Sequence, residues 1–239
     1  MPGIVSITSF QDGGFEPDAS AVVAVDVIRA TTTAVTAAVL GRRCFPVRTL
    51  DEAAARAREL ERPLLVGEQR GMLPPGFDLN NSPAALAERD DLDRPVVLLS
   101  SSGTQLICAA HAAGNGSVYV ACLRNYTAQA RELAQSSDRV SLVGAGSRGE
   151  FREEDQLCCA WIAAGLIAAG WEPENDPTAE LVQRWHGAGL DAVSGGRSAA
   201  YLRSSGQTAD LDFILAAVDD VDAVFPVRDG EIVMAQAGA

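Results

Sequence analysis

The stretch Ala21-Val-Val-Ala-Val-Asp-Val-Ile-Arg-Ala-Thr-Thr-Thr33 decides the fold class of this chain. Residues 22–27 form a largely apolar, β-branched run typical of a buried strand, and the alanine-rich pattern that starts near Thr32 and stops at Gly41 indicates a helix. A strand that leads directly into a helix is the building unit of an α/β sheet, and ligands bind at the carboxyl ends of such strands. Asp26 and Arg29 lie at this junction, where a carboxylate and a guanidinium suit a metal ion and an oxyanion. We therefore interpret the segment as half of a phosphate site.

The same alternation of β-branched runs and alanine-rich stretches continues through the first two-thirds of the chain and predicts an α/β sheet with helices on its faces. After residue 146 the pattern is mostly helical, and a turn signal at Asp229-Gly230 predicts a closing hairpin. The other expected strands are Ile4–Thr8, Arg43–Val47, Pro63–Gly67, Pro95–Ser100, Ser117–Cys122 and Arg139–Gly144. The other expected helices are Ala53–Leu60 behind a capping box at Thr49–Glu52, Gln105–Ala113, Glu153–Ala169, one from Asp176, Ser194–Arg203 and Ala209–Val218. We expect a single domain over residues 1–239, with lobes 1–146 and 147–239 as the alternative division.

Composition excludes several classes of function. A formal net charge of −13 opposes binding to nucleic acid or to an anionic membrane surface, because both need clustered cations. All 19 basic residues are Arg, so a Walker P-loop and a Schiff-base enzyme lack their essential Lys. The chain has two His residues and no Cys followed six positions later by Arg, which also excludes the His-based and Cys-based phosphatases. Phosphate chemistry in this chain must depend on carboxylates, Arg, hydroxyls and a metal ion.

The sequence also indicates where the protein works. No apolar stretch approaches the roughly 20 residues that a membrane-spanning helix needs, and the N-terminal segment lacks the features of a signal peptide. Five cysteines, an odd number, lie within apolar segments and do not form a disulfide framework. We therefore expect a cytoplasmic protein, and association into a homo-oligomer is left open.

A Gly- and Pro-rich loop follows the strand expected to end at residue 67 and carries the second set of candidate residues. Glu68 and Asp78 lie in this loop together with Asn81 and Ser82. Loops that follow buried strands carry function more often than cores do. Ser82 is followed by a proline, which is also ordinary chemistry for the start of a helix.

Three further segments combine strand ends with polar side chains. Ser102-Gly103-Thr104 follows a strand and opens a helix, so free backbone N–H groups and hydroxyls could bind an anion there. Arg124-Asn125 follows another strand. Asp155, in the acidic first turn of a long helix, is a candidate metal ligand or general base, although acidic residues there also complement the helix dipole.

Taken together, these segments resemble the 2-phosphosulfolactate phosphatase family. The stretches that carry the resemblance are Val25–Thr33, Leu65–Glu68, Gly76–Pro83, Ser102–Thr104, Arg124-Asn125, Gly144–Gly146 with Glu154-Asp155, and Ser205-Gly206 with Asp210. The resemblance implies a three-layer α/β/α fold with a mixed, largely parallel sheet. It also implies a Mg²⁺-dependent phosphatase that hydrolyses 2-phospho-3-sulfolactate to 3-sulfolactate and phosphate, a step toward coenzyme M.

This activity assigns roles to the candidate residues. Asp26, Glu68 and Asp78 would hold Mg²⁺ directly or through water, since Mg²⁺ prefers oxygen ligands. Arg29 would bind the phosphoryl oxygens, with the helix start at Ser102–Thr104 as a second anchor. A water molecule activated by the metal would attack phosphorus, and a covalent intermediate on Asp26 is the alternative. The remaining negative charges of the substrate need cations, for which Arg70, Arg124 and Arg148 are candidates.

Two other functions fit the same residues. The protein could hydrolyse another small phospho-2-hydroxyacid, or it could bind a phosphorylated metabolite without hydrolysing it. In each case the partner is a small anionic phosphorylated molecule.

Overall fold

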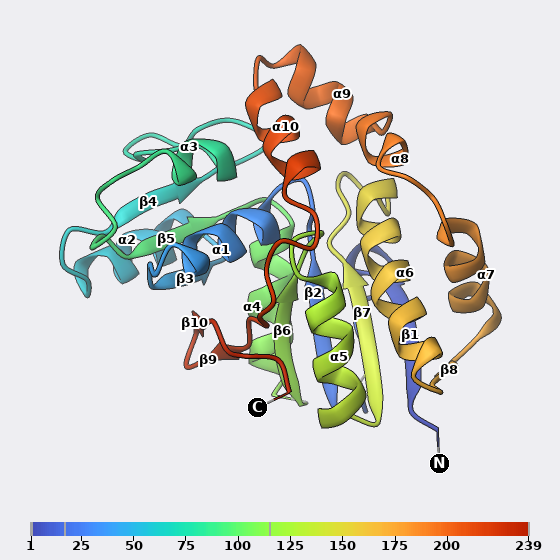
Figure 1. Cartoon of the computed structure of the whole chain (residues 1–239). Coiled ribbons are helices and arrows are strands. Elements are labelled where there is room, and N and C mark those ends of the chain that lie inside the picture. Colours follow the sequence, from blue (N-terminus) through green and yellow to red (C-terminus); the bar gives the residue numbers. More distant parts are fainter. Residues whose placement is uncertain (1, 17, 115, 239) are drawn as a thin grey trace.

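The structure is a computed structural model that describes residues 2–16, 18–114 and 116–238. Its strands divide between two five-stranded sheets, which lie at an angle to each other in Figure 1. The first sheet has the order β6-β2-β7-β1-β8, and all of its strands are parallel. Its strands are β1 (Ile4–Ser9), β2 (Ala21–Val25), β6 (Ser117–Ala121), β7 (Arg139–Gly144) and β8 (Glu172–Pro173).

The second sheet has the order β4-β5-β3-β10-β9 and is mixed. Its first three strands are parallel, whereas β10 pairs antiparallel with both β3 and β9. The strands are β3 (Cys44–Val47), β4 (Leu64–Gly67), β5 (Val96–Leu99), β9 (Val227–Arg228) and β10 (Glu231–Ile232). The segment between β2 and β6 therefore leaves the first sheet to build the second, and the C-terminal hairpin completes it.

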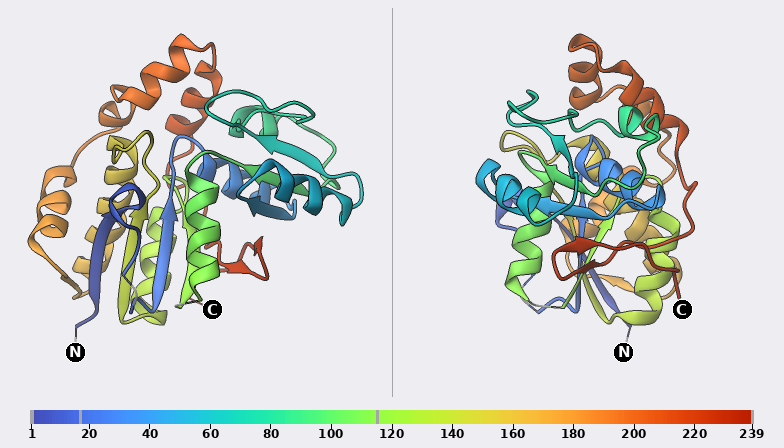
Figure 2. Two further views of the ribbon diagram at one scale, coloured as in Figure 1. Left: turned by 180° about the vertical axis from the view of Figure 1, so that it is seen from behind. Right: turned by 90° about the vertical axis from the view of Figure 1, so that its left-hand side faces the viewer.

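Helices cover both sheets and the end at which the parallel strands of the first sheet finish. One face of the first sheet packs against α5 (Tyr126–Ser136), α6 (Glu153–Ala168) and α7 (Asp176–Trp185). The helices α1 (Ala30–Val39) and α4 (Gly103–Ala113) contact both sheets, and α2 (Leu50–Arg58) packs on the second sheet. Helix α3 (Pro83–Ala87) lies beside α1. The last helices, α8 (Asp191–Ser194), α9 (Arg197–Ser204) and α10 (Thr208–Ala216), cross over the carboxyl ends of the first sheet (Figures 1 and 2).

Burial on both faces explains why β2 is apolar throughout. Val22 and Ala24 join the hydrophobic cluster that lies between the two sheets, whereas Val23 and Val25 join the cluster under α5 and α6. All five residues of β2 are buried. A strand that is covered on both faces cannot alternate polar and apolar residues, so a continuous apolar run is the expected pattern.

The predicted fold class, helices packed on a largely parallel sheet, is confirmed. The expected strands match β1 to β7 within one or two residues at each end, and the closing hairpin turns at Asp229-Gly230 as predicted. The Thr49 hydroxyl accepts the N–H of Glu52 at 3.1 Å, as a capping box requires, but the Glu52 carboxylate accepts the N–H of Arg48 at 2.8 Å. The helix expected at residues 194–203 corresponds to α9 but begins three residues later, because Ser194 instead ends the short helix α8. The division of the strands between two sheets was not indicated by their sequence pattern.

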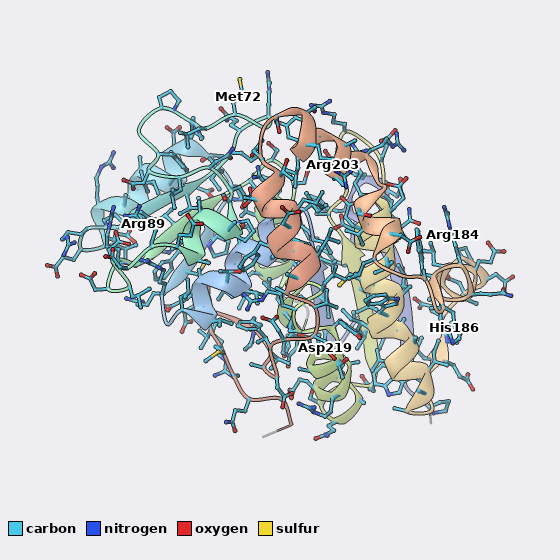
Figure 3. The ribbon with its side chains drawn as sticks, turned by 45° about the horizontal axis from the view of Figure 1, so that its top comes forward. Met72, Arg89, Arg184, His186, Arg203 and Asp219 are labelled. Atoms are coloured by element: carbon cyan, nitrogen blue, oxygen red, sulfur yellow. The ribbon has the colours of Figure 1, made fainter. Side chains whose placement is uncertain are left out.

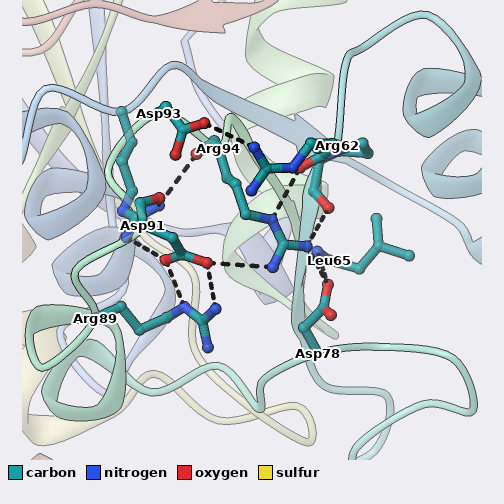
Figure 4. A network of polar contacts seen from close by, with 9 residues as sticks. Arg62, Leu65, Asp78, Arg89, Asp91, Asp93 and Arg94 are labelled. Atoms are coloured by element: carbon teal, nitrogen blue, oxygen red, sulfur yellow. Dashed lines mark hydrogen bonds and ion pairs between the residues drawn. The ribbon is translucent and has the colours of Figure 1, made fainter.

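A network of ion pairs holds the segment between α3 and β5 against β4. Asp91 accepts hydrogen bonds from Arg42, Arg89 and Arg94 (Figure 4). Arg94 also donates to Asp78 Oδ2 at 3.2 Å, and the N–H of Leu65 donates to the same oxygen at 2.9 Å. Asp78 therefore ties its loop to β4.

In the described residues we find no helix that is both long and apolar enough to cross a membrane.

Candidate active site

Asp26 follows the last residue of β2 and lies at the start of α1. Its Oδ1 accepts the N–H of Ala30 at 3.2 Å, and its backbone N–H donates to the Thr31 hydroxyl at 2.9 Å. A carboxylate that accepts the first free N–H of a helix is held in place by an otherwise unpaired donor. The other oxygen, Oδ2, lies against Gly103 at the start of α4. The carboxylate is thus fixed between two helix N-termini.

Arg29 is buried rather than solvated, and its partner is not Asp26. One guanidinium nitrogen, Nη1, donates to Asp210 in α10. Asp210 also accepts the hydroxyl of Ser82 at 2.5 Å and the N–H of Ala84 at 3.2 Å. Arg29 is therefore anchored through one nitrogen, and its side chain still reaches the cavity described below. The remaining N–H groups of a guanidinium held in this way can donate to an anion.

Glu68 organises the loop that follows β4. Its Oε1 accepts the N–H of Ser101 at 2.6 Å, and its Oε2 accepts the N–H of Gly71 at 2.6 Å and the Ser101 hydroxyl at 2.9 Å. Gly67, the residue before it, has a φ of +158°, and a Cβ there would lie 2.2 Å from the carbonyl oxygen of Leu99. Glycine is needed at this position because the ends of the paired strands β4 and β5 leave no room for a Cβ.

The first turn of α6 brings two buried carboxylates to the same place. Asp155 accepts the N–H of Val27 at 2.8 Å through Oδ1 and the N–H of Gly146 at 3.2 Å through Oδ2. It therefore joins the end of β2 to the loop after β7. Glu154 is 1% exposed, and its Oε2 has no hydrogen-bond partner among the described residues. A buried carboxylate oxygen without a partner is costly, so its position requires a compensating ligand or proton.

These residues line one cavity of about 860 Å³. It lies between the loops after β2 and β7 on one side and the loops after β4 and β5 on the other, with α9 above it. Figure 3 tips this end of the molecule forward, with Met72 marking the loop after β4 and Arg203 marking α9. The hydroxyl of Tyr201 in α9 donates to the carbonyl oxygen of Gly71 at 3.1 Å and so connects α9 to the loop after β4.

Opposite charges are balanced in the cavity wall, although the chain as a whole is strongly acidic. The acidic residues in its lining are Asp26, Glu68, Glu150, Glu154 and Asp155, and the basic residues are Arg29, Arg70, Arg148, Arg152 and Arg197. Glu150 pairs with Arg152 at 2.8 Å and with Arg197 at 2.6 Å. Arg70 and Arg148 form no ion pair within the described part of the chain.

Burial and mutual repulsion change the proton affinity of the carboxylates. Burial raises the pKa of Asp26 to about 7, and the charges of Glu68 and Glu154 add to the rise, whereas the hydrogen bond from Ala30 opposes it. Burial, with the charges of Asp26 and Glu154, raises the pKa of Asp155 well above its usual value. Burial likewise raises the pKa of Glu154. Carboxylates that disfavour each other's ionised form lie where a cation would be stabilised.

The structure brings about half of the predicted site residues to this cavity. Asp26, Arg29, Glu68, Asn81, Ser102 and Asp155 line it, as do Arg70 and Arg148. Ser102 is the N-cap residue of α4, and its side chain makes no capping hydrogen bond, so its hydroxyl stays available.

The other predicted residues lie outside the cavity lining and have structural partners of their own. Asp78 is held by Arg94, and the Ser82 hydroxyl caps α3 and contacts Asp210. Arg124 pairs with Asp220 at 2.7 Å. The remaining three are engaged locally: Asn125 Oδ1 accepts the N–H of Cys122, Thr104 bonds with Ser100, and Gly103 packs against Asp26. The structure therefore gives no support to a metal-ligand role for Asp78 or to direct substrate contacts at Ser82, Thr104, Arg124 and Asn125, and these roles stay predictions.

Four charged residues of the cavity lining were missing from the predicted site: Glu150, Glu154, Arg152 and Arg197. Glu154 adjoins Asp155 in the sequence, but acidic residues at a helix start have an ordinary explanation in the helix dipole. Arg197 belongs to α9, whose position above the sheet has no local sequence signal. Glu150, Arg152 and Glu154 come from one segment after β7, and the packing of α9 over the strand ends adds Arg197, which pairs with Glu150.

The fold and cavity define an α/β protein with a site for a small anionic ligand. Residues 11–230 match a family model described as 2-phosphosulpholactate phosphatase. Similar proteins named "Probable 2-phosphosulfolactate phosphatase" include one from Deinococcus radiodurans, 35% identical over 82% of each chain. Another, from Thermus thermophilus, is 33% identical over 88% of this chain and 89% of that protein. A third, from Pseudothermotoga lettingae, is 39% identical over 60% of this chain and 61% of that protein. The chain therefore belongs to the 2-phosphosulfolactate phosphatase family, a family of phosphoric monoester hydrolases.

Proposed function

We propose that this protein is a Mg²⁺-dependent phosphatase that hydrolyses 2-phospho-3-sulfolactate to 3-sulfolactate and phosphate. The observation that supports the proposal best is the convergence of Asp26, Glu68 and Glu154 with Arg29 in one cavity. These residues come from separate segments and supply both acidic oxygens and a fixed positive charge. Coenzyme M biosynthesis, a cytoplasmic location and a homo-oligomeric state stay predictions.

The donor set of the cavity fits Mg²⁺. Its candidate ligands are all oxygen atoms, from the carboxylates of Asp26, Glu68 and Glu154 and the amide of Asn81. The Glu154 oxygen and Oδ1 of Asn81 are buried without partners in the described residues. Within those residues no three Asp, Glu, His or Cys side chains converge closely enough to hold a metal alone. A Mg²⁺ site does not need a third carboxylate, because Mg²⁺ keeps several waters and commonly uses one or two carboxylates together with substrate phosphate.

The residues of the chain would divide the catalytic work as follows. Bound Mg²⁺ would neutralise charge on the phosphoryl oxygens. Arg29, fixed by Asp210, would donate to those oxygens and hold the phosphoryl group in line for attack. The Ser102 hydroxyl at the start of α4 would donate to another phosphoryl oxygen. Attack by water is the favoured path, and attack by Asp26 is the alternative.

The test is phosphate release from 2-phospho-3-sulfolactate, measured with Mg²⁺ and with chelator. We expect Asp26→Asn and Arg29→Ala to lower kcat/KM by at least about 10²-fold. Asp78→Asn is a matched control, because Asp78 is a loop carboxylate near β4 that the cavity does not include. We expect it to keep wild-type turnover.

Two results would contradict the proposal. If the wild-type protein binds Mg²⁺ by calorimetry but releases no phosphate, it is a non-catalytic binding protein. Turnover that persists in chelator and in Asp26→Asn would exclude the proposed site. A comparison with unsulfonated phospho-2-hydroxyacids decides which member of this substrate class is preferred.

A further inference from the structure

Two turns of the same kind line opposite sides of the cavity, and each has Arg-Gly at its tip. In the first, Gln69 and Met72 exchange backbone hydrogen bonds of 2.9 and 3.1 Å around Arg70 and Gly71. In the second, Ser147 and Glu150 exchange bonds of 2.9 and 3.1 Å around a second Arg-Gly pair, residues 148 and 149. The first turn follows β4 in the second sheet, and the second follows β7 in the first sheet.

Both arginines adopt a backbone conformation that arginine does not favour. The φ angles are +56° and +82° for Arg70 and Gly71, and +54° and +77° for Arg148 and Gly149. Positive φ at both central residues defines a type I′ turn, in which Asn, Asp or Gly is the usual first residue. A residue with a Cβ and a long side chain is disfavoured there, so turn formation does not account for either arginine.

Carboxylates in the cavity wall hold each turn in place. Glu68 accepts the N–H of Gly71, and the Ser101 hydroxyl accepts the N–H of Arg70 at 2.8 Å. Asp155 accepts the N–H of Gly146, the residue that leads into the second turn. Both arginine side chains line the same cavity, and neither forms an ion pair within the described residues. Backbone anchoring of this kind positions a cation without neutralising it.

We propose that the two Arg-Gly turns, Arg70-Gly71 and Arg148-Gly149, form a clamp for the two anionic groups of the substrate that are not transferred. This inference rests on the proposed function, which assigns the phosphoryl group to Arg29. A phosphorylated 2-hydroxyacid with an acidic 3-substituent carries two further anions, a carboxylate and a sulfonate. Each sheet supplies one unpaired guanidinium, and each guanidinium binds one of these two anions. Arg suits this role because it binds planar or tetrahedral oxyanions through several N–H groups at once. The clamp selects substrates with three anionic groups over those with two.

The test uses Arg70→Gly and Arg148→Gly, because glycine removes the side chain and suits the turn. Arg62→Gly is the matched control: Arg62 also has a positive φ, of +46°, but is exposed, pairs with Asp93 and lies outside the cavity. Calorimetry measures binding of 3-sulfolactate, which carries both anions and no phosphate. We expect each cavity variant to weaken binding about 10- to 100-fold and the control to bind as wild type does.

Kinetics with 2-phospho-3-sulfolactate and 2-phospholactate complete the test, since the second substrate lacks the sulfonate. We expect one glycine variant to abolish the preference for the sulfonated substrate and the other to lower kcat/KM for both substrates alike. Lysine at the same positions should restore part of the loss, because it keeps the charge but not the multiple N–H groups. Binding and discrimination that match those of Arg62→Gly in both cavity variants would overturn the clamp. Phosphate release by the wild-type protein reports on the proposed function separately.

Discussion

Replacing Gly103 by alanine would test whether Asp26 is held in position by the start of α4. A Cβ at residue 103 would lie 2.4 Å from Asp26 Oδ2 and 2.6 Å from the Cβ of Ala30. Ordinary contacts begin near 3.4 Å, so the Asp26 carboxylate would have to move by about 1 Å. Gly103 does not have a positive φ, so alanine is compatible with its backbone.

The substitution is expected to affect stability modestly and catalysis strongly. Alanine in place of glycine in a helix stabilises it by up to about 1 kcal/mol, whereas overpacking costs about 1–3 kcal/mol. The net change in the free energy of unfolding should therefore lie between about zero and a loss of about 3 kcal/mol. A catalytic group misplaced by about 1 Å can cost about 10²-fold in rate, so kcat/KM for phosphate release should fall by that factor in Gly103→Ala.

Gly165→Ala is the matched control for this prediction. Gly165 lies in α6, and a Cβ there would meet the Cβ of Ala130 in α5 at 2.8 Å. The substitution is the same and also crowds a helix, but the crowded neighbour is not in the cavity lining. We expect Gly165→Ala to lower the melting temperature and leave kcat/KM within about twofold of wild type. Wild-type kcat/KM in a folded Gly103→Ala variant would refute the role of this contact.

Two further predictions concern carboxylates. Glu154→Gln removes the charge of a buried carboxylate whose Oε2 lacks a partner in the described residues. We therefore expect a higher melting temperature without Mg²⁺ and weaker Mg²⁺ binding by calorimetry. Unchanged Mg²⁺ affinity would exclude Glu154 as a ligand. Asp91→Asn leaves the buried Arg42 without its ionic partner, and we expect it to destabilise the protein by about 1–3 kcal/mol at neutral pH. Hydrogen bonds from Arg89, Arg42 and Arg94 hold the pKa of Asp91 below its usual value, so its contribution is complete above the unfolded-state pKa of about 4 and is lost as the pH falls below it. Thermal unfolding of both proteins from pH 7 to pH 3 should show the difference shrinking, and a constant difference would contradict this assignment.

Local sequence signals predicted the parts of the fold that depend on local interactions. The apolar run of β2 and the turn at residues 229–230 are determined by burial and by backbone conformation, and both lie where the sequence indicates. Asp26 and Glu68 could also be predicted, because the residue after a parallel strand lies at the edge where ligands bind. The second sheet could not, because no local pattern specifies which of two sheets a buried strand joins.

Asp78 and Glu154 show why the site itself was only partly predictable. Both are carboxylates in positions where ordinary solvation explains a charge. Asp78 lies in a loop rich in Gly and Pro, but Arg94, sixteen residues later, draws it to the outer side of β4. Glu154 starts a helix, and it is buried because α9 packs across the strand ends. Pairings over long sequence distances therefore decide which acidic residues reach the cavity.

Arginine suits a position beside this buried cavity better than lysine does. A lysine close to a low-dielectric wall loses its proton readily, because desolvation lowers the pKa of the ammonium group, whereas a guanidinium keeps its charge. Arg29 is 6% exposed and still adjoins the cavity, so it can present a permanent positive charge beside the acidic cluster. Net charge governs long-range repulsion, which ions in solution screen within about 10 Å, whereas unpaired guanidinium groups act at contact distance. A chain with a net charge of −13 can therefore bind an anion where individual arginines lack a carboxylate partner, as Arg70 and Arg148 do within the described residues.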